Sequence, residues 1–94
     1  MKKYIVEQHK GHGFLRMGKT AEYDDRAAAI LYAGEMKQKY KGTWIVLEAT
    51  GEEQGVRDYN GVRWYDVYRE IYRADGSPLY RWPVLLKKEE GVTK

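Results

Sequence analysis

The stretch VRDYNGVRWYDVYREIYR, residues 56–73, carries the strongest fold signal in the chain. Asn60 and Gly61 separate two runs that are rich in β-branched and aromatic residues, which favour strands. An Asn-Gly pair is a preferred two-residue hairpin loop, because it tolerates positive φ at both positions. These residues therefore predict a β-hairpin, and the preceding residues 51–55, GEEQG, are expected to form a loop.

A helix is predicted before this hairpin, near residues 25–40. Asp24 or Asp25 can cap its N-terminus, alanines fill its interior, and Gly42 follows its last turn. Leu31 falls nearly opposite the apolar stripe and is expected to be exposed. The stripe itself should lie on a sheet, and it consists of Ala29, Tyr32, Ala33, Met36 and Tyr40.

Further strands are predicted on both sides of the helix. Residues 3–8 and 14–17 should form an N-terminal hairpin, and residues 43–50 should form a strand after the helix. Residues 79–88 should form a last strand, which Pro83 directs to a sheet edge or a bulge. The expected fold is α+β, with one amphipathic helix on a mainly antiparallel sheet of about five or six strands, in the order β-β-α-β-β-β-β.

Length and composition are those of one globular domain. The chain has 94 residues, of which 43% are hydrophobic and 33% charged. Residues 1–88 are assigned to the domain, and the charged residues 89–94 to a flexible tail. There is no cysteine for a disulfide or a thiolate site. Because no apolar run matches a signal peptide or a membrane span, a cytoplasmic protein without a membrane partner is expected.

Strand alternation divides the remaining side chains between two sheet faces. In the strand after the helix, Ile45, Leu47 and Ala49 are expected to meet the helix, together with Val67 and Ile71 of the next strand. A single helix covers only one face, so the opposite face is expected to be open. That open face would carry Trp44, Glu48, Trp64, Asp66, Tyr68, Glu70 and Tyr72.

The open face is the predicted binding site for a protein partner, because interface cores are enriched in Trp and Tyr. The candidate partner-binding residues are Trp44, Trp64, Asp66, Tyr68, Glu70 and Tyr72. Self-association through this face or an edge strand is a close variant. The favoured function is a small non-catalytic inhibitor, adaptor or accessory protein. In style, this short, cysteine-free and aromatic-rich chain resembles the small accessory proteins of bacteria and their phages, although it shares no motif with them.

Nucleic-acid binding is the alternative. A β-bulge within residues 62–73 would exchange the two faces from that point onward and bring arginines beside the exposed aromatics. A net charge of +3 is compatible with binding to phosphates. The residues assigned to this alternative are Arg57, Arg63, Tyr65, Arg69, Arg73 and Arg81.

Nucleotide binding ranks third and depends on residues 13–20, GFLRMGKT, which match the phosphate-loop pattern. A true loop of this kind follows a buried strand and precedes a helix that starts at Lys19, whereas the expected helix starts later. His9 and His12 lack an obvious third ligand, and Ser77 lies in a turn without a base. No catalytic residue, metal or cofactor is therefore assigned, and a small-molecule ligand is not expected.

Overall fold

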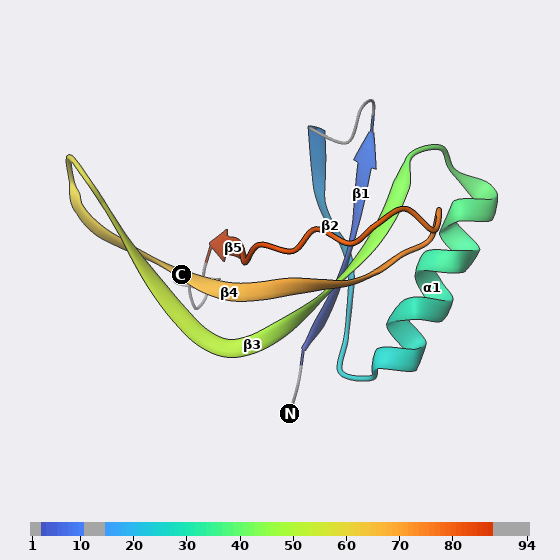
Figure 1. Cartoon of the computed structure of the whole chain (residues 1–94), viewed down its shortest axis with the longest axis horizontal. Coiled ribbons are helices and arrows are strands. Elements are labelled where there is room, and N and C mark those ends of the chain that lie inside the picture. The colour runs from blue at the N-terminus through green and yellow to red at the C-terminus, as the bar shows by residue number, and fades with distance from the viewer. Residues whose placement is uncertain (1–2, 11–14, 88–94) are drawn as a thin grey trace, which may run out of the picture.

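The chain folds into one helix and a five-stranded antiparallel sheet (Figure 1). The structure is a computed structural model that describes residues 3–10 and 15–87, with side chains for residues 3–9 and 20–87. The elements are β1 (Tyr4–Lys10), β2 (Leu15–Tyr23), α1 (Arg26–Lys39), β3 (Thr43–Asp58), β4 (Gly61–Arg73) and β5 (Val84–Lys87). The predicted α+β class is confirmed, with three strands after the helix instead of four. The predicted tail, residues 89–94, lies outside the described residues.

The strand order in the sheet is β2-β1-β3-β4-β5, and each neighbouring pair is antiparallel. β5 is short, follows Pro83 directly and lies at the edge of the sheet, as expected for a strand next to a proline. α1 packs across β3, β1 and β2. The far part of the β3–β4 hairpin projects away from α1 at the other end of the molecule (Figure 1).

The helix follows its sequence signals closely. Asp25 is the N-cap, and its carboxylate accepts a hydrogen bond of 3.2 Å from the Ala27 N–H. Ala29 and Ala33 are buried against the sheet, and Leu31 is exposed, as predicted. The rest of the predicted stripe packs against this core, except that the side chain of Tyr40 is largely exposed, although its ring centre lies 6.2 Å from that of Trp44.

The hairpin extends further than expected. Residues 51–55 belong to β3 and pair with β4, so the predicted loop is wrong. At the tip, Asp58 pairs with Gly61, which leaves Tyr59 and Asn60 as the loop residues. Of these four residues only Gly61 has positive φ, at 114°, while the Asp58 carboxylate accepts the Asn60 N–H at 2.8 Å. The turn therefore lies one residue earlier than predicted, because the Asp58 side chain supports it and the glycine absorbs the strain.

The two faces of β3 are the reverse of the prediction. Trp44 and Val46 lie under the helix with Tyr4 and Val6. Ile45 and Leu47 lie on the opposite face of the sheet. Alternation groups side chains correctly but does not say which group meets the helix. The small alanines of α1 leave room there for large aromatic side chains, and the Tyr32 and Trp44 rings meet edge to face at 6.5 Å. We call these surfaces the helix face and the distal face.

A β-bulge in β4 exchanges the faces near its end. Val46 pairs with Tyr72, but Leu47 pairs with Glu70, so Ile71 is the extra residue. Tyr72 consequently lies on the helix face beside Val46, in contrast to the prediction. Arg73, the partner of Ile45, lies on the distal face with Glu70.

Candidate functional site

The predicted partner-binding residues do not form one open surface. Trp44 is only 3% exposed and lies with Tyr72 in the core beneath the helix, so their predicted position on an open face is wrong. Trp64, Asp66, Tyr68 and Glu70 do share the distal face by alternation along β4. Among these four, only Trp64 is largely exposed, at 56%, whereas Tyr68 and Glu70 are buried.

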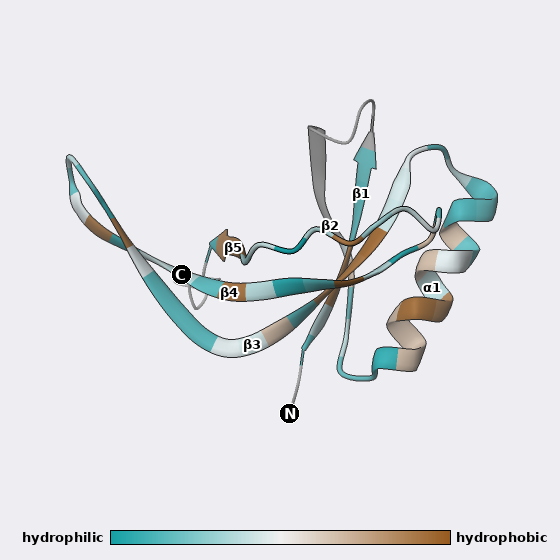
Figure 2. Ribbon diagram, viewed as in Figure 1, coloured by the Kyte–Doolittle hydropathy of each residue, from teal (hydrophilic) through white to brown (hydrophobic). Residues whose placement is uncertain are grey.

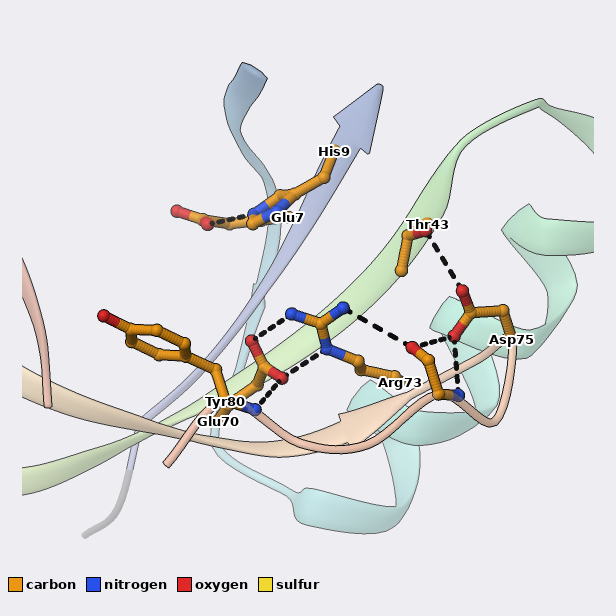
Figure 3. A network of polar contacts seen from close by, with 8 residues as sticks. Glu7, His9, Thr43, Glu70, Arg73, Asp75 and Tyr80 are labelled. Carbon is orange, nitrogen blue, oxygen red and sulfur yellow. Dashed lines mark hydrogen bonds and ion pairs between the residues drawn. The ribbon is translucent and has the colours of Figure 1, made fainter. Parts of the chain in front are cut away.

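Near Glu70 the distal face is covered, because the chain after β4 turns back across it. The carboxylate of Glu70 is paired with the Arg73 guanidinium, whose Nη2 lies 3.2 Å from Oε2 (Figure 3). The same carboxylate accepts the backbone N–H of Tyr80 at 2.8 Å. This hydrogen bonding to Glu70 raises the pKa of the Arg73 guanidinium. Glu70 is therefore a structural anchor that fastens the returning chain to the sheet.

The turn that starts this return is held by Asp75. Its carboxylate accepts hydrogen bonds from the Ser77 hydroxyl at 2.7 Å, the Ser77 N–H at 3.0 Å and the Thr43 hydroxyl at 3.2 Å (Figure 3). Because these bonds favour the charged form, they lower the pKa of Asp75 below its usual value. The bonds to Ser77 fix the turn internally, and the bond to Thr43 connects it to the start of β3.

The returning chain, PLYRWP, is bounded by a proline at each end, and we call residues 78–83 the proline-bounded segment. It exposes Leu79, Tyr80 and Trp82, and Trp82 is 71% exposed. The Tyr80 ring points away from the Glu70 carboxylate that holds its backbone (Figure 3). Sequence reasoning missed this segment because it assigned residues 79–88 to a strand. The available signal was the Tyr-Arg-Trp triplet between two prolines, since proline disfavours a regular strand.

Exposed apolar side chains are concentrated in two places. Of the nine large hydrophobic residues that are exposed in the described part of the chain, three lie in the proline-bounded segment. Four more lie in the projecting part of the hairpin, residues 51–64, which we call the arm (Figure 2). The arm residues are Val56, Tyr59, Val62 and Trp64. Surface patches of this kind are typical of contact sites.

A surface cavity of about 450 Å³ adjoins the segment. Arg81 and Pro83 line it on one side, and β3 and β4 line it on the other with Glu48, Tyr68 and Arg69 among the contributing residues. Because arginines and glutamates both contribute to its wall, the cavity favours neither an anionic nor a cationic ligand.

The arginines of the nucleic-acid alternative are not gathered on one surface. Arg63 forms an ion pair with Asp58 at 2.9 Å, Arg69 with Glu48 at 3.2 Å, and Arg73 with Glu70. Alternation also places Arg57 and Arg73 on the distal face and Arg63, Tyr65 and Arg69 on the other side of the sheet, while Arg81 lies in the proline-bounded segment. Three of the five arginines therefore already neutralise carboxylates of this chain.

Glu48 is buried on the helix face between Arg69 and Tyr4. The Tyr4 hydroxyl donates a hydrogen bond of 3.1 Å to the Glu48 carboxylate. Burial, and this bond to a carboxylate, raise the pKa of Tyr4. Tyr4 and Arg69 thus give the buried Glu48 carboxylate hydrogen-bonding partners, so that it can be packed beside the helix.

The phosphate-loop match lacks the structure that it requires. Gly18, Lys19 and Thr20 lie within β2, where Lys19 pairs with Glu7, and the helix begins only at Arg26. The first two residues of the match, 13 and 14, lie outside the described residues. These positions in an extended strand do not cradle a phosphate.

The sequence analysis assigned no metal to His9 and His12. His9 lies 3.2 Å from the Glu7 carboxylate (Figure 3), and His12 lies outside the described residues. In residues 3–10 and 15–87, no three side chains of the kinds that bind metals come together.

Comparisons of the chain with protein-family models, with curated proteins and with solved structures find no match. Within its described part, the chain has no helix that is both long and apolar enough to cross a membrane. The side chains that the fold presents are therefore the starting point for its function.

Proposed function

We propose that this chain is a small non-catalytic protein of the cytoplasm that binds a protein partner through the proline-bounded segment. Its role would be that of an inhibitor, adaptor or accessory protein. One observation carries the proposal: Leu79, Tyr80 and Trp82 are exposed on a segment whose backbone is fastened from beneath by the buried Glu70. The proposed binding site is thus the proline-bounded segment, in place of the sheet face that was predicted from the sequence.

The fixed backbone favours binding. Association is weakened when a loop must be ordered at the interface, and a segment that is already held loses less conformational entropy. Glu70 holds the Tyr80 N–H, and Asp75 holds the turn before it. Trp, Tyr and Arg are the residue types that dominate interface energetics, and the segment presents one of each, at positions 80–82.

A protein partner is favoured over a nucleic acid by the charges around the segment. Nucleic-acid binding depends on cations that are available to phosphates. Arg69 and Arg73 are instead engaged with Glu48 and Glu70. Leu79 adds an apolar contact that phosphates and sugars do not match.

Affinity capture from a lysate of the source organism tests the proposal. The wild-type chain should retain a protein partner with and without nuclease treatment, and Trp82→Ala with Tyr80→Ala should lose it. Leu31→Ala is the matched control, because Leu31 is an exposed hydrophobic residue on the helix. Equal capture by the double variant would contradict the proposal. Capture that disappears on nuclease treatment would instead support the nucleic-acid alternative.

A further inference from the structure

The outer edge of β3 in the arm has no neighbouring strand among the described residues. β1 pairs with β3 over residues 43–48, and the Ala49 N–H donates to the Lys3 carbonyl at 2.9 Å. Beyond that point β4 occupies one edge of β3, and no described strand lies along the other edge at residues 52–58. Every second residue of such an edge directs its N–H and C=O outward, which makes the edge a template for another strand.

We propose that two copies of this chain pair through this edge, antiparallel and about a two-fold axis at Gly55, to form one continuous sheet. This inference concerns the arm and is independent of the proline-bounded segment. A two-fold axis that relates antiparallel strands is perpendicular to the sheet and leaves each side chain on its own face. One residue must therefore face its own copy, and the charges select which one.

Centring on Gly55 places Glu53 opposite Arg57 of the partner subunit, and the reciprocal pair forms across the axis. Centring on Gln54 would place Glu53 opposite glycine, and centring on Val56 would place Arg57 opposite glycine, so neither register forms an ion pair. The register at Gly55 is thus the one in which the edge is complementary to itself.

Glu53 has an acidic neighbour within its own chain. Glu53 and Asp66 are directly opposite each other on β3 and β4 and share the distal face. Arg57 of the partner subunit would lie directly opposite Glu53, on the side of β3 away from Asp66. The same register places Glu52 opposite Asp58 of the partner subunit, and within each chain Arg63 already pairs with Asp58 at 2.9 Å.

Trp64 provides the apolar contact. It is opposite Gly55, and a Cβ atom at Gly55 would lie 3.4 Å from two ring carbons of Trp64 and 2.8 Å from Val62 Cγ1. The indole therefore covers the glycine and extends toward the free edge, while 56% of Trp64 remains exposed. The two β4 strands of the dimer would be three strand spacings, about 14 Å, apart. Because neither Gly55 has a side chain, the two Trp64 indoles would have room to approach each other above the two glycines.

Sedimentation across a concentration series tests the pairing. Wild type should dimerise, and either Glu53→Arg or Arg57→Glu should weaken the dimer by about tenfold or more, since each exchanges two ion pairs for two repulsions. Mixing these two variants should restore a one-to-one dimer. The introduced arginine of the first variant then faces the introduced glutamate of the second, and the native Arg57 of the first faces the native Glu53 of the second. Circular dichroism checks that each variant is folded.

Two controls separate this inference from the proposed function. Arg81→Glu changes the same charge outside the arm and should leave the dimer intact. The double variant Trp82→Ala with Tyr80→Ala should lose the partner but remain dimeric. A monomeric wild type, a dimer that is insensitive to both charge reversals, or variants that do not combine on mixing would each overturn the inference.

Discussion

Replacement of Glu70 by Gln should destabilise the protein and release the proline-bounded segment. The Glu70 side chain is only 3% exposed and pairs with Arg73, whose side chain is 22% exposed. Breaking a buried ion pair costs about 3–5 kcal/mol, because one charge remains buried without its partner. Since Arg73 keeps some contact with water and Gln keeps one acceptor oxygen, we expect a loss of about 2–4 kcal/mol in the free energy of unfolding.

Urea unfolding of wild type, Glu70→Gln, Arg73→Met and the double variant measures this loss and the coupling between the two residues. A coupling of about 0.5–3 kcal/mol is expected for side chains in one hydrogen-bonded pair. Glu52→Gln is the control, because Glu52 is exposed, and it should change stability by no more than about 0.5 kcal/mol. Hydrogen exchange should also show a loss of protection at the Tyr80 amide, which donates to Glu70.

A change of less than about 0.5 kcal/mol in the free energy of unfolding of Glu70→Gln, the scale of a neutral surface substitution, would contradict this role of Glu70. Continued protection of the Tyr80 amide in that variant would contradict it as well. Either result would mean that the segment is held by contacts other than the Glu70 carboxylate.

Two further predictions concern the core and the turn. Leu47→Ala should cost about 2–5 kcal/mol in urea unfolding, because Leu47 is buried in the distal cluster, whereas Leu31→Ala should cost no more than about 0.5 kcal/mol; equal losses would contradict the assigned burial. The pKa of Asp75 is lowered on folding, so its stabilisation is fully present above the unfolded value of about 3.9 and is lost as the pH falls through the lower folded pKa. The stability difference between wild type and Asp75→Asn should therefore be constant near neutral pH and shrink below about pH 4, and a difference independent of pH would refute this role for the carboxylate.

The helix and the hairpin could be predicted from sequence because their signals are local. Asp25 caps the helix where a side-chain acceptor was expected, and the alanine interior and final lysines extend to its end at Lys39. Asn60 and Gly61 marked the hairpin to within one residue. The one-residue error arose because the Asp58 side chain, two residues before Asn60, supports a different turn.

The candidate site was less predictable, because it depends on chain segments that meet only in the folded protein. Trp64 was assigned to an exposed face and is exposed, and its role in binding remains a prediction. Trp82 was missed, because the residues around Pro83 were assigned to a regular strand. Glu70 was assigned to the open surface, but the returning chain covers it and uses it as an acceptor.

The sequence by itself determined the class of fold, the position of the helix and the sets of side chains that share a face up to the bulge in β4, since these follow from caps, turns and the two-residue period of a strand. Only the tertiary structure decided that Trp44 and Val46, rather than Ile45 and Leu47, lie under the helix. The small side chains of Ala29 and Ala33 leave room under the helix for the large ring of Trp44, which favours this arrangement. The bulge at Ile71 also depends on pairing between strands, and such pairing is absent from any single segment.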